Sequence, residues 1–582
     1  MKKNIFTGLF VFLCSMAYAY SSINIFVEGA DESRPYNYTV KAENIEKNGY
    51  NSIPDILSGL SEINAVSRSF SKIQADISVL GGSFEQTAVF LDGVRINDPQ
   101  TGHYNFDIPA TILDISGITI HKKPALISGA DSYSGGISID TKKPVKNEFK
   151  YRSVYGSHNT FQNTFLMMKK INKFGFSLSG ETASSAGYSE GTDYITKTFF
   201  FKAGYGDIYR FTLGFDEKDY GAYDFYTPGA GMDSREFVIT KYMAFSAEPM
   251  KGLRADVYFR SHYDRFILAD SDPSYYSNRH TTGTYGINLK YSRDISQNIR
   301  GSAAYNINRD EMQSSGMGNH YRFRSAISAD CSFQPGRNWE AKLKFGAEKN
   351  HEGGEWGFVP SLLLEYDIMP FMDAYISYAH SLRHPNFTEL YYDSPLNKGS
   401  PELKPEKIKS FNTGFNIDIG AIGFRAEGFI KRGLDIIDWE KEDESENIWK
   451  IKNIGKINTA GYTVSAGFPV KFFDFYADYT YTDSYAENSY ISKYGITNLR
   501  NKLDLGVEFE ILKCRAAFIY GYKNYDSRDD YFSAADIKVS RKFRDVFEVF
   551  LKGENIFNSY FKEIPGIPAA GRYFEAGITA VY

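Results

Sequence analysis

A two-residue alternation of apolar and polar side chains runs from about residue 149 to the end of the chain and limits what it can fold into. In Leu503–Ile511 the odd-numbered residues are apolar, and the even-numbered ones are Asp, Gly or Glu. Phe473–Thr482 and Ala341–Glu348 follow much the same pattern. Successive side chains of a strand point to opposite faces, so each segment predicts a β-strand with one apolar and one polar face.

The number and spacing of these segments predict a closed barrel. We count about 22 of them, with starts near residues 421, 448 and 471 among others. Short connections such as 171–173 tend to alternate with longer ones such as 184–196. Short turns on one rim and long loops on the other are typical of an outer-membrane barrel, with the short side in the periplasm. A bilayer offers no water to unpaired backbone groups, so the sheet must close.

Composition agrees with such a barrel. The 44 Tyr and 46 Phe supply the aromatic girdles that flank a lipid-facing band. No segment after the leader approaches ~18 consecutive apolar residues, which excludes a helical membrane protein. The net charge of −5 gives no indication of nucleic-acid binding. A soluble all-β protein such as a propeller would also alternate, but no blade-like repeat is present.

The first residues predict an exported protein. Lys2 and Lys3 precede the mostly apolar run Ile5–Met16, and Ala17-Tyr18-Ala19 has the small-x-small pattern of a cleavage site. The run is shorter than the ~20 residues that a membrane helix needs. We therefore expect residues 1–19 to be a signal peptide, with a periplasmic segment at 20–40.

Residues 41–148 have a mixed pattern and predict a small α+β domain. Ser52, followed by an early Pro and by Asp55, is typical of a helix start. Asp92-Gly93 lies between two apolar runs, which predicts a tight hairpin. A barrel of ~22 strands has a wide lumen that known examples plug. The predicted fold is thus an all-β transmembrane barrel (149–582) with an N-terminal plug domain (41–148) inside it.

Several motifs resemble those of TonB-dependent outer-membrane receptors, in the right order over essentially the whole mature chain. They are DILSGL, QTAVFLDGVRINDPQTGH, ISGITIHKKPALISGADSYSGGISIDTKKP, SPELKPEKIKSFNTGF and the closing GENIFNSY and GRYFEAGITAVY. The chain departs from the family at Leu80, where Arg is usual, and at Lys122-Lys123, where Arg-Gly is usual. The charge that normally pairs the plug to the barrel wall is therefore lost at Leu80 and kept at Lys122.

The resemblance implies a receptor that takes up a scarce small ligand, energised by a TonB-type inner-membrane complex. Chain length and segment order look most like the cobalamin receptor group, so cobalamin is the predicted ligand. A ferric siderophore or haem is the alternative, since SLRHPNFTELYY also occurs in their receptors. A passive porin, or less favourably a secreted β-rich enzyme, would be a different class. We expect a monomer in outer-membrane lipid of a Gram-negative bacterium, with no catalytic constellation and no required cofactor.

Candidate site residues fall into groups. Ile23, Asn24, Ile25, Phe26 and Val27 form a short apolar stretch that could add a strand to TonB, or could be a plain first strand. Asp224 and Asp233 are weak calcium candidates, because two acids are too few for a site. The predicted ligand contacts come from the plug apex and loop aromatics, each of which could instead have an ordinary structural role: Arg95, Asn97, Gln100, His103, Tyr104, Tyr223, Phe225, Tyr226, Tyr275, Tyr276, Tyr391 and Tyr392.

Overall fold

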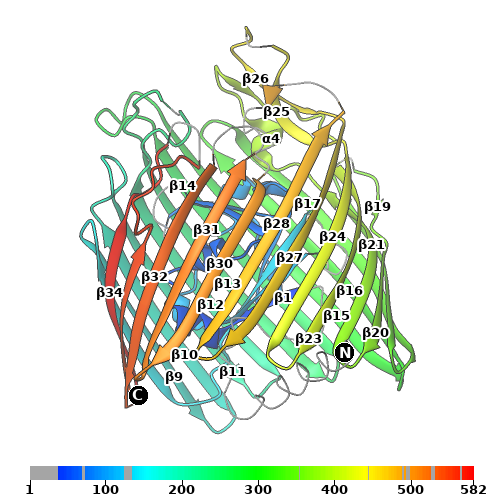
Figure 1. Ribbon diagram of the computed structural model, residues 1–582. Helices are drawn as coiled ribbons and strands as arrows, with labels where there is room; N and C mark the ends of the chain where they lie inside the picture. Colours follow the sequence, from blue (N-terminus) through cyan, green and yellow to red (C-terminus); the bar gives the residue numbers. More distant parts are fainter. Residues whose placement is uncertain are drawn as a thin grey trace, which may run out of the picture.

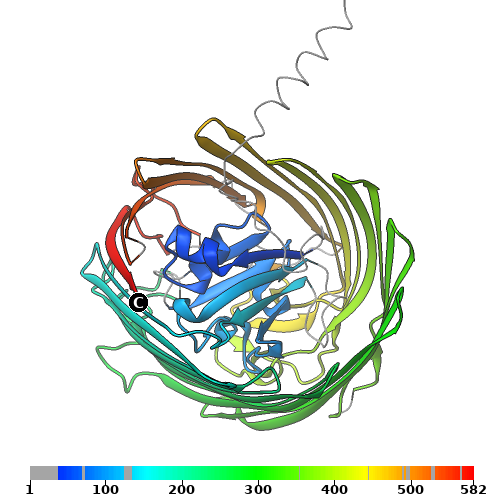
Figure 2. The ribbon, with the colours of Figure 1, turned by 90° about the horizontal axis from the view of Figure 1, so that it is seen from below.

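The computed structural model describes residues 37–67, 73–122, 134–227, 229–352, 354–443, 445–487, 491–492, 499–525, 531–544, 546–563 and 567–582. In these residues an antiparallel barrel encloses a smaller domain (Figures 1 and 2). The described part of the wall is a closed sheet of 22 strands, as the sequence predicts. The last strand pairs with the first, and Phe149 and Tyr582 exchange two backbone hydrogen bonds of 2.8 Å across the seam.

The wall strands follow one another along the chain, each paired with the next. They are β8 (Glu148–Gly156), β9 (Thr160–Ile171), β10 (Phe174–Ser185), β11 (Tyr194–Tyr205), β12 (Tyr209–Gly221), β13 (Arg235–Met250), β14 (Leu253–Ile267), β15 (Ser277–Ser296), β16 (Ile299–Ser314), β17 (Gly318–Gly336), β18 (Trp339–Asn350), β20 (Ser361–Met369), β21 (Met372–Arg383), β23 (Glu406–Ile419), β24 (Ile422–Leu434), β27 (Lys456–Val470), β28 (Phe473–Ala486), β30 (Leu499–Ile511), β31 (Cys514–Tyr525), β32 (Tyr531–Phe543), β33 (Phe547–Glu554) and β34 (Tyr573–Val581), with the two-residue β19 (Gly357–Phe358) beside β18.

The alternation of the sequence becomes an outer apolar face and an inner polar face. On β30, Leu505 is exposed on the outside, whereas Asp504 and Glu508 are buried toward the lumen. Exposed apolar side chains such as Phe199 and Phe345 continue this outer face around the barrel. Only a lipid solvent makes such a surface favourable. None of the described helices is long and apolar enough to cross a bilayer.

One predicted wall strand is wrong. The segment near residue 448 is β26 (Trp449–Asn453), which belongs to a loop sheet above the barrel (Figure 1). That sheet also contains β22 (Asn397–Lys398), β25 (Ile437–Lys441) and β29 (Ile491–Ser492). The wall strand in question is β27, which begins at Lys456. A loop hairpin alternates just as a wall strand does, so periodicity cannot separate the two.

The plug fills the centre of the barrel when seen along its axis (Figure 2). Its five-stranded sheet has the order β1-β6-β7-β4-β5, and β2 and β3 form a separate hairpin. Its elements are β1 (Asn37–Lys41), α2 (Ala42–Asn48), α3 (Ile53–Ser58), β2 (Ile63–Ser67), β3 (Ala75–Val79), η1 (Phe84–Gln86), β4 (Thr87–Leu91), β5 (Val94–Arg95), η2 (Gly102–Tyr104), η3 (Ile112–Asp114), β6 (Ile115–His121) and β7 (Gly135–Thr141).

Local signals in the plug act as predicted. Ser52 caps α3, and its Oγ accepts a hydrogen bond of 3.2 Å from the backbone N–H of Asp55. Asp92 and Gly93 turn β4 into β5 with φ values of 51° and 84°. Positive φ at both positions is what a type I′ hairpin turn requires. Leu57 and Ile77 are fully buried in the apolar core beneath these elements.

Candidate functional site

Basic side chains of the barrel wall hold the plug by its backbone. Lys502 on β30 donates to the carbonyl oxygens of Ser58, Leu60 and Ile63 at 2.7, 2.7 and 3.2 Å. Its side chain is only 2% exposed. Charge-assisted hydrogen bonds in such a dry setting are stronger than neutral ones. The wall therefore gives a charged donor to carbonyls between the end of α3 and the start of β2, one of which, that of Leu60, also accepts a 3.0 Å hydrogen bond from the N–H of Ile63.

A second set of wall cations pairs with plug carboxylates. Lys218 on β12 lies 2.6 Å from Asp107, and Arg260 on β14 lies 2.5 Å from Asp98. All four side chains are buried. Removing one partner of such a pair leaves an uncompensated buried charge. These pairs consequently resist displacement of the plug along β12–β14.

The two departures from the family pattern both lie at the plug–wall boundary. Leu80 has φ 44°, and its carbonyl accepts a 2.8 Å hydrogen bond from Lys431 on β24. Lys122 lies 2.6 Å from Glu62 of the plug and 3.5 Å from Glu427 of the wall. Burial lowers the pKa of Lys122, but the two carboxylates outweigh it and raise that pKa above its ordinary value. Lys122 thus keeps a plug-to-wall ion pair. At Leu80, which has no charged side chain, the wall residue Lys431 supplies the cation and binds the backbone carbonyl.

The predicted apex residues lie mostly beneath the outer surface. Asn97 stabilises the hairpin: it accepts from the N–H of Val89 at 2.8 Å and donates to the carbonyl of Thr87 at 2.9 Å. The Nε of Arg95 donates to the Asn97 side chain at 3.2 Å. Gln100 is buried, and its carbonyl accepts a 3.1 Å hydrogen bond from Thr388 of an outer loop.

His103 and Tyr104 face the wall and the neighbouring loop. The Nδ1 of His103 lies 2.7 Å from Asp76, and its ring stacks on Phe84 at 4.4 Å. Tyr104 donates a 2.6 Å hydrogen bond to Glu236 and is buried. Burial, with Asp264 and Glu236 nearby, raises the pKa of Tyr104 well above its ordinary value. Tyr104 therefore stays a hydrogen-bond donor, and contact of these residues with a ligand stays a prediction.

The loop between β12 and β13 closes over this apex. Phe225 is buried, and Tyr226 donates 3.3 Å hydrogen bonds to Gln74 and Glu236. Tyr223 in the same loop is 36% exposed. The structure therefore brings Tyr226 next to His103, with ring centroids 6.1 Å apart.

The other predicted aromatics occupy separate places. Tyr275 is exposed at a loop tip, and the hydroxyl of Tyr276 accepts from Asn278 at 2.6 Å. Tyr391 stacks on His320 with centroids 3.5 Å apart. Tyr392 meets Trp439 edge-on at 6.3 Å. Tyr391 and Tyr392 thus belong to the outer loop after β21, and Tyr275 and Tyr276 to the loop between β14 and β15.

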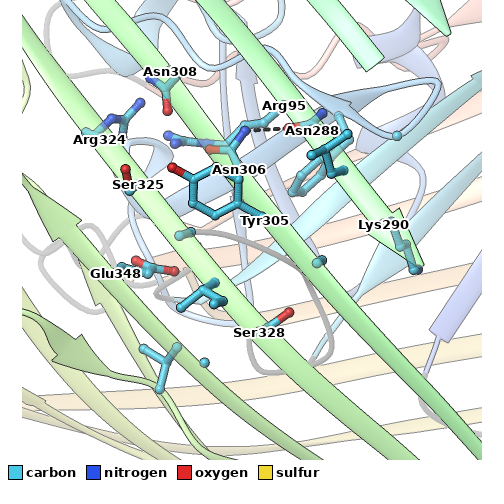
Figure 3. A pocket seen from close by; sticks show the side chains of 18 of the residues that line it. Arg95, Asn288, Lys290, Tyr305, Asn306, Asn308, Arg324, Ser325, Ser328 and Glu348 are labelled. Atoms are coloured by element: carbon cyan, nitrogen blue, oxygen red, sulfur yellow. Dashed lines mark hydrogen bonds between the residues drawn. The ribbon is translucent and has the colours of Figure 1, made fainter. Parts of the chain in front are cut away.

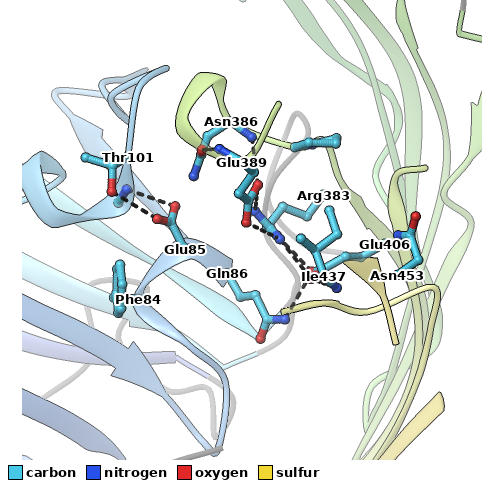
Figure 4. A network of polar contacts seen from close by, with 12 residues as sticks. Phe84, Glu85, Gln86, Thr101, Arg383, Asn386, Glu389, Glu406, Ile437 and Asn453 are labelled. Atoms are coloured by element: carbon cyan, nitrogen blue, oxygen red, sulfur yellow. Dashed lines mark hydrogen bonds and ion pairs between the residues drawn. The ribbon is translucent and has the colours of Figure 1, made fainter. Parts of the chain in front are cut away.

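Residues that sequence reasoning missed join the outer loop to the plug through α4 (Phe387–Tyr391), shown in Figure 4. Arg383 contacts Glu389 at 3.0 Å and Glu406 at 2.8 Å, and all three are buried. Gln86 of the plug donates a 3.0 Å hydrogen bond to Glu406. Burial raises the pKa of Glu389 to about 7 against the opposing charge of Arg383. The sequence signal was Asn386, three residues before Glu389, which together form a capping box.

The N–H of Phe387 also donates to the carbonyl of Pro99 at 2.9 Å. With the Thr388 contact, α4 therefore sits directly on the plug apex. A ligand arriving from outside would meet this loop before the plug, which the loop contacts through two backbone hydrogen bonds to Pro99 and Gln100.

The calcium candidates serve the loop backbone. The carboxylate of Asp224 accepts hydrogen bonds from the N–H groups of Gly229, Gly231 and Met232 at 3.1, 3.2 and 2.8 Å. Asp233 accepts from the N–H of Ser271 at 3.0 Å. Among the described residues, no group of three or more His, Cys, Asp or Glu could hold a metal ion. A calcium site here stays a prediction that the loop geometry does not favour.

The signal peptide and the stretch Ile23–Val27 lie outside the described residues. Their assignment therefore stays a prediction from the sequence.

The plugged barrel defines the class of protein, and comparison with known families agrees. Residues 100–556 match the family model "TonB dependent receptor-like, beta-barrel", and residues 31–136 match "TonB-dependent Receptor Plug Domain". The chain belongs to the TonB-dependent receptors, which are outer-membrane proteins of Gram-negative bacteria. This is a family of receptors and transporters rather than enzymes.

Solved structures of similar fold have low sequence identity. The copper transporter OprC has a TM-score of 0.80 at 13% identity, over 96% of this chain and 99% of that one. The siderophore receptor PirA from Acinetobacter baumannii has a TM-score of 0.76 at 12% identity, over 94% and 98%. The ferric enterobactin receptor PfeA has a TM-score of 0.76 at 13% identity, over 94% and 100%. At these identities the likeness concerns the fold.

Proposed function

We propose that this receptor actively imports a scarce, metal-containing small ligand, as a monomer in outer-membrane lipid, with energy from a TonB-type inner-membrane complex. The observation that supports active transport is the plug itself, whose carbonyls and carboxylates are held by buried wall cations such as Lys502 and Arg260. A passive porin needs an open lumen. A plug fastened by buried charge-assisted bonds needs work to move it.

The stretch Ile23–Val27 is the proposed point where TonB pulls. An extended apolar segment can add a strand to the exposed sheet edge of a partner, so backbone hydrogen bonds supply the affinity. Residue 37, where the plug sheet begins, follows it closely in the chain. Force applied there would reach β1, which pairs with β6 in the plug sheet.

The ligand class is proposed on two grounds. Chain length and motif order favour cobalamin, whereas the solved structures of similar fold carry names that refer to copper, a siderophore and ferric enterobactin. Each of these names refers to a metal, a metal complex or a molecule that binds a metal. Catalysis forms no part of the proposal.

Uptake by living cells tests the function. The full-length chain would be expressed in a Gram-negative host that lacks its own receptors, with and without TonB, and offered labelled cobalamin, haem and ferric siderophores. We expect uptake of one ligand that disappears without TonB or after Ile25→Pro, while ligand binding to purified Ile25→Pro protein is unchanged. Uptake that continues without TonB would identify a passive channel and contradict the proposal.

A further inference from the structure

A cavity of ≈ 300 Å³ separates the plug from one side of the barrel wall (Figure 3). Its wall side is a row of directly paired residues that crosses five strands, from β14 to β18. This row consists of Arg254, Lys290, Ala304, Ser328 and Gly346. Its plug side includes Arg95, which Figure 3 shows facing Asn306 and Asn288.

Part of the wall that faces the cavity carries small side chains. Ala304, Ala326, Ser328 and Gly346 line it on β16, β17 and β18. Elsewhere, long side chains such as Lys502 span the same gap and reach the plug. Small residues on several adjacent strands leave a space that side chains of the plug do not fill.

The cavity extends over much of the height of the wall. At one end is Arg254, one residue after β14 begins at a short periplasmic turn. At the other is His384, in the outer loop that follows β21. A solute in this space would lie between the loop that carries α4 and the periplasmic rim.

The lining is predominantly cationic. Six Lys and Arg residues line it against the two carboxylates of Asp256 and Glu348: Arg95, Arg254, Lys290, Arg324, Lys344 and Lys349. Two of these cations are already paired: Arg254 lies 3.0 Å from Asp256 and donates to the Asp92 carbonyl of the plug at 2.7 Å, and Arg324 lies 3.0 Å from Asp310. Lys290 is exposed, and its ammonium group makes no hydrogen bond or ion pair with any described residue. A cleft lined by one sign of charge concentrates ligands of the opposite sign.

Hydroxyl groups add polar contacts. Ser328 and Ser381 are 8% and 5% exposed, and neither Oγ has a hydrogen-bond partner in the described part of the chain. Both residues line the cavity. A buried polar group without a partner is costly, so these hydroxyls favour an occupant with polar atoms.

We infer that this cavity is an internal binding station for a polyanionic metal chelate, with carboxylate or catecholate oxygens as the recognised groups. The inference rests on the proposed function and narrows its ligand class. Ammonium and guanidinium groups bind such oxygens by charge-assisted hydrogen bonds. The volume suits a citrate-sized ligand or the anionic part of a larger chelate. Cobalamin, which has no net negative charge, fits this lining less well.

The first test measures binding to the purified full-length receptor in detergent. The probes are ferric citrate, a ferric tris-catecholate, a neutral ferric trihydroxamate and cobalamin. We expect an anionic chelate to bind, and the double variant Lys290→Gln/Lys344→Gln to weaken it about tenfold or more, since one or two charge-assisted hydrogen bonds are lost. Lys251→Gln, an exposed change on the turn before β14, is the matched control and should have no effect.

The second test probes the cavity without requiring the natural ligand. In a Cys331→Ser/Cys514→Ser background, Ser328→Cys would be treated with anionic and cationic thiol reagents of similar size. We expect the anionic reagent to react faster there than at Lys251→Cys, and this preference to fall when Lys290→Gln is added. A bound anionic chelate should protect Ser328→Cys from labelling.

The outcomes separate the inference from the proposed function. If folded Ser328→Cys protein shows no anionic preference, or only cobalamin or the neutral chelate binds, the station is not a polyanion site, even where uptake requires TonB. If labelling and binding behave as expected but uptake continues without TonB, the cavity is a polyanion site and the proposal of active transport is contradicted.

Discussion

The two sides of the plug differ in how they meet the barrel. Toward β8–β14 and β24–β33, buried wall cations reach the plug, as Lys218 does to Asp107 and Lys502 to three carbonyls. Toward β14–β18 lies the ≈ 300 Å³ cavity, whereas a cavity beside α2 and α3 is ≈ 80 Å³. The wall is polar on both sides, and the cavity lies where small residues such as Ala304, Ser328 and Gly346 interrupt its longer side chains.

This contrast suggests how the plug can both close the lumen and give way. A plug held evenly on all sides would have to lose every contact at once. A plug fastened on one side and separated by a cavity on the other can widen an existing space while its fastened side stays in place.

The largest effect is expected where the outer loop meets the plug. Arg383→Met removes the cation between Glu389 and Glu406 and leaves two buried carboxylates without it, a cost of about 3–5 kcal/mol. Hydrogen exchange in α4 should become much faster. Adding Glu389→Gln should recover part of the protection, because it removes one uncompensated charge. Unchanged exchange in α4 would show that this network does not fasten the loop.

On the fastened side, Lys502→Met should loosen the end of α3. Three carbonyls lose their charged donor, although that of Leu60 keeps the N–H of Ile63, and we expect a local cost of about 3 kcal/mol because hydrogen bonds to a charged group contribute about 1.5–3 kcal/mol. Hydrogen exchange of residues 58–63 measures this loss, and Lys251→Met is the control. Equal protection in both variants would mean that wall cations do not hold the plug.

The same substitution on the two sides should give opposite results. Ser328→Leu enters the cavity, so local stability should change by less than about 1 kcal/mol, whereas uptake should slow about tenfold if passage meets a steric barrier of about 1.4 kcal/mol. Ser179→Leu instead removes a 2.5 Å hydrogen bond to Asp114 and should destabilise the plug. Thermal unfolding and uptake are measured for both. Similar destabilisation in both variants would contradict the contrast.

The smallest effect is a pH dependence at the cavity. His121 on β6 lines the cavity, and burial lowers its pKa from 6.5 to about 4. The unfolded chain then binds a proton at a higher pH than the folded plug, so stability is lost as pH falls from 6.5 toward 4. Exchange protection of β6, corrected for intrinsic rates, should fall less on acidification in His121→Asn than in the parent. Identical slopes would rule out His121 as the cause.

Much of the fold could be predicted because side-chain alternation and turn residues, which act over a few residues, agree with the closed barrel and its plug. The alternation in Leu503–Ile511 predicts which side chains face lipid, and Asp92-Gly93 predicts its turn, since both depend on backbone geometry within a few residues. The prediction of a wall strand near residue 448 was wrong because a loop hairpin has the same period as a wall strand. The exact domain boundaries stay a prediction.

The site was less predictable. Apex residues such as Gln100 and Tyr104 are buried by loops and wall strands far away in the sequence, and their contact with a ligand stays a prediction. The Arg383–Glu389–Glu406 network and the cavity at Ser328 and Lys290 were missed. Each is assembled from segments whose proximity is set by strand register.

By itself, the sequence determined a lipid-facing barrel, a leading plug domain and the family, because these follow from side-chain period, turn chemistry and motif order. Only the tertiary structure decided which wall lysines reach the plug and which of them face the cavity instead. The reason is physical. Lys and Ser side chains point inward on both sides of the barrel, and the position of the plug determines whether each of them meets a carbonyl, a carboxylate or open space.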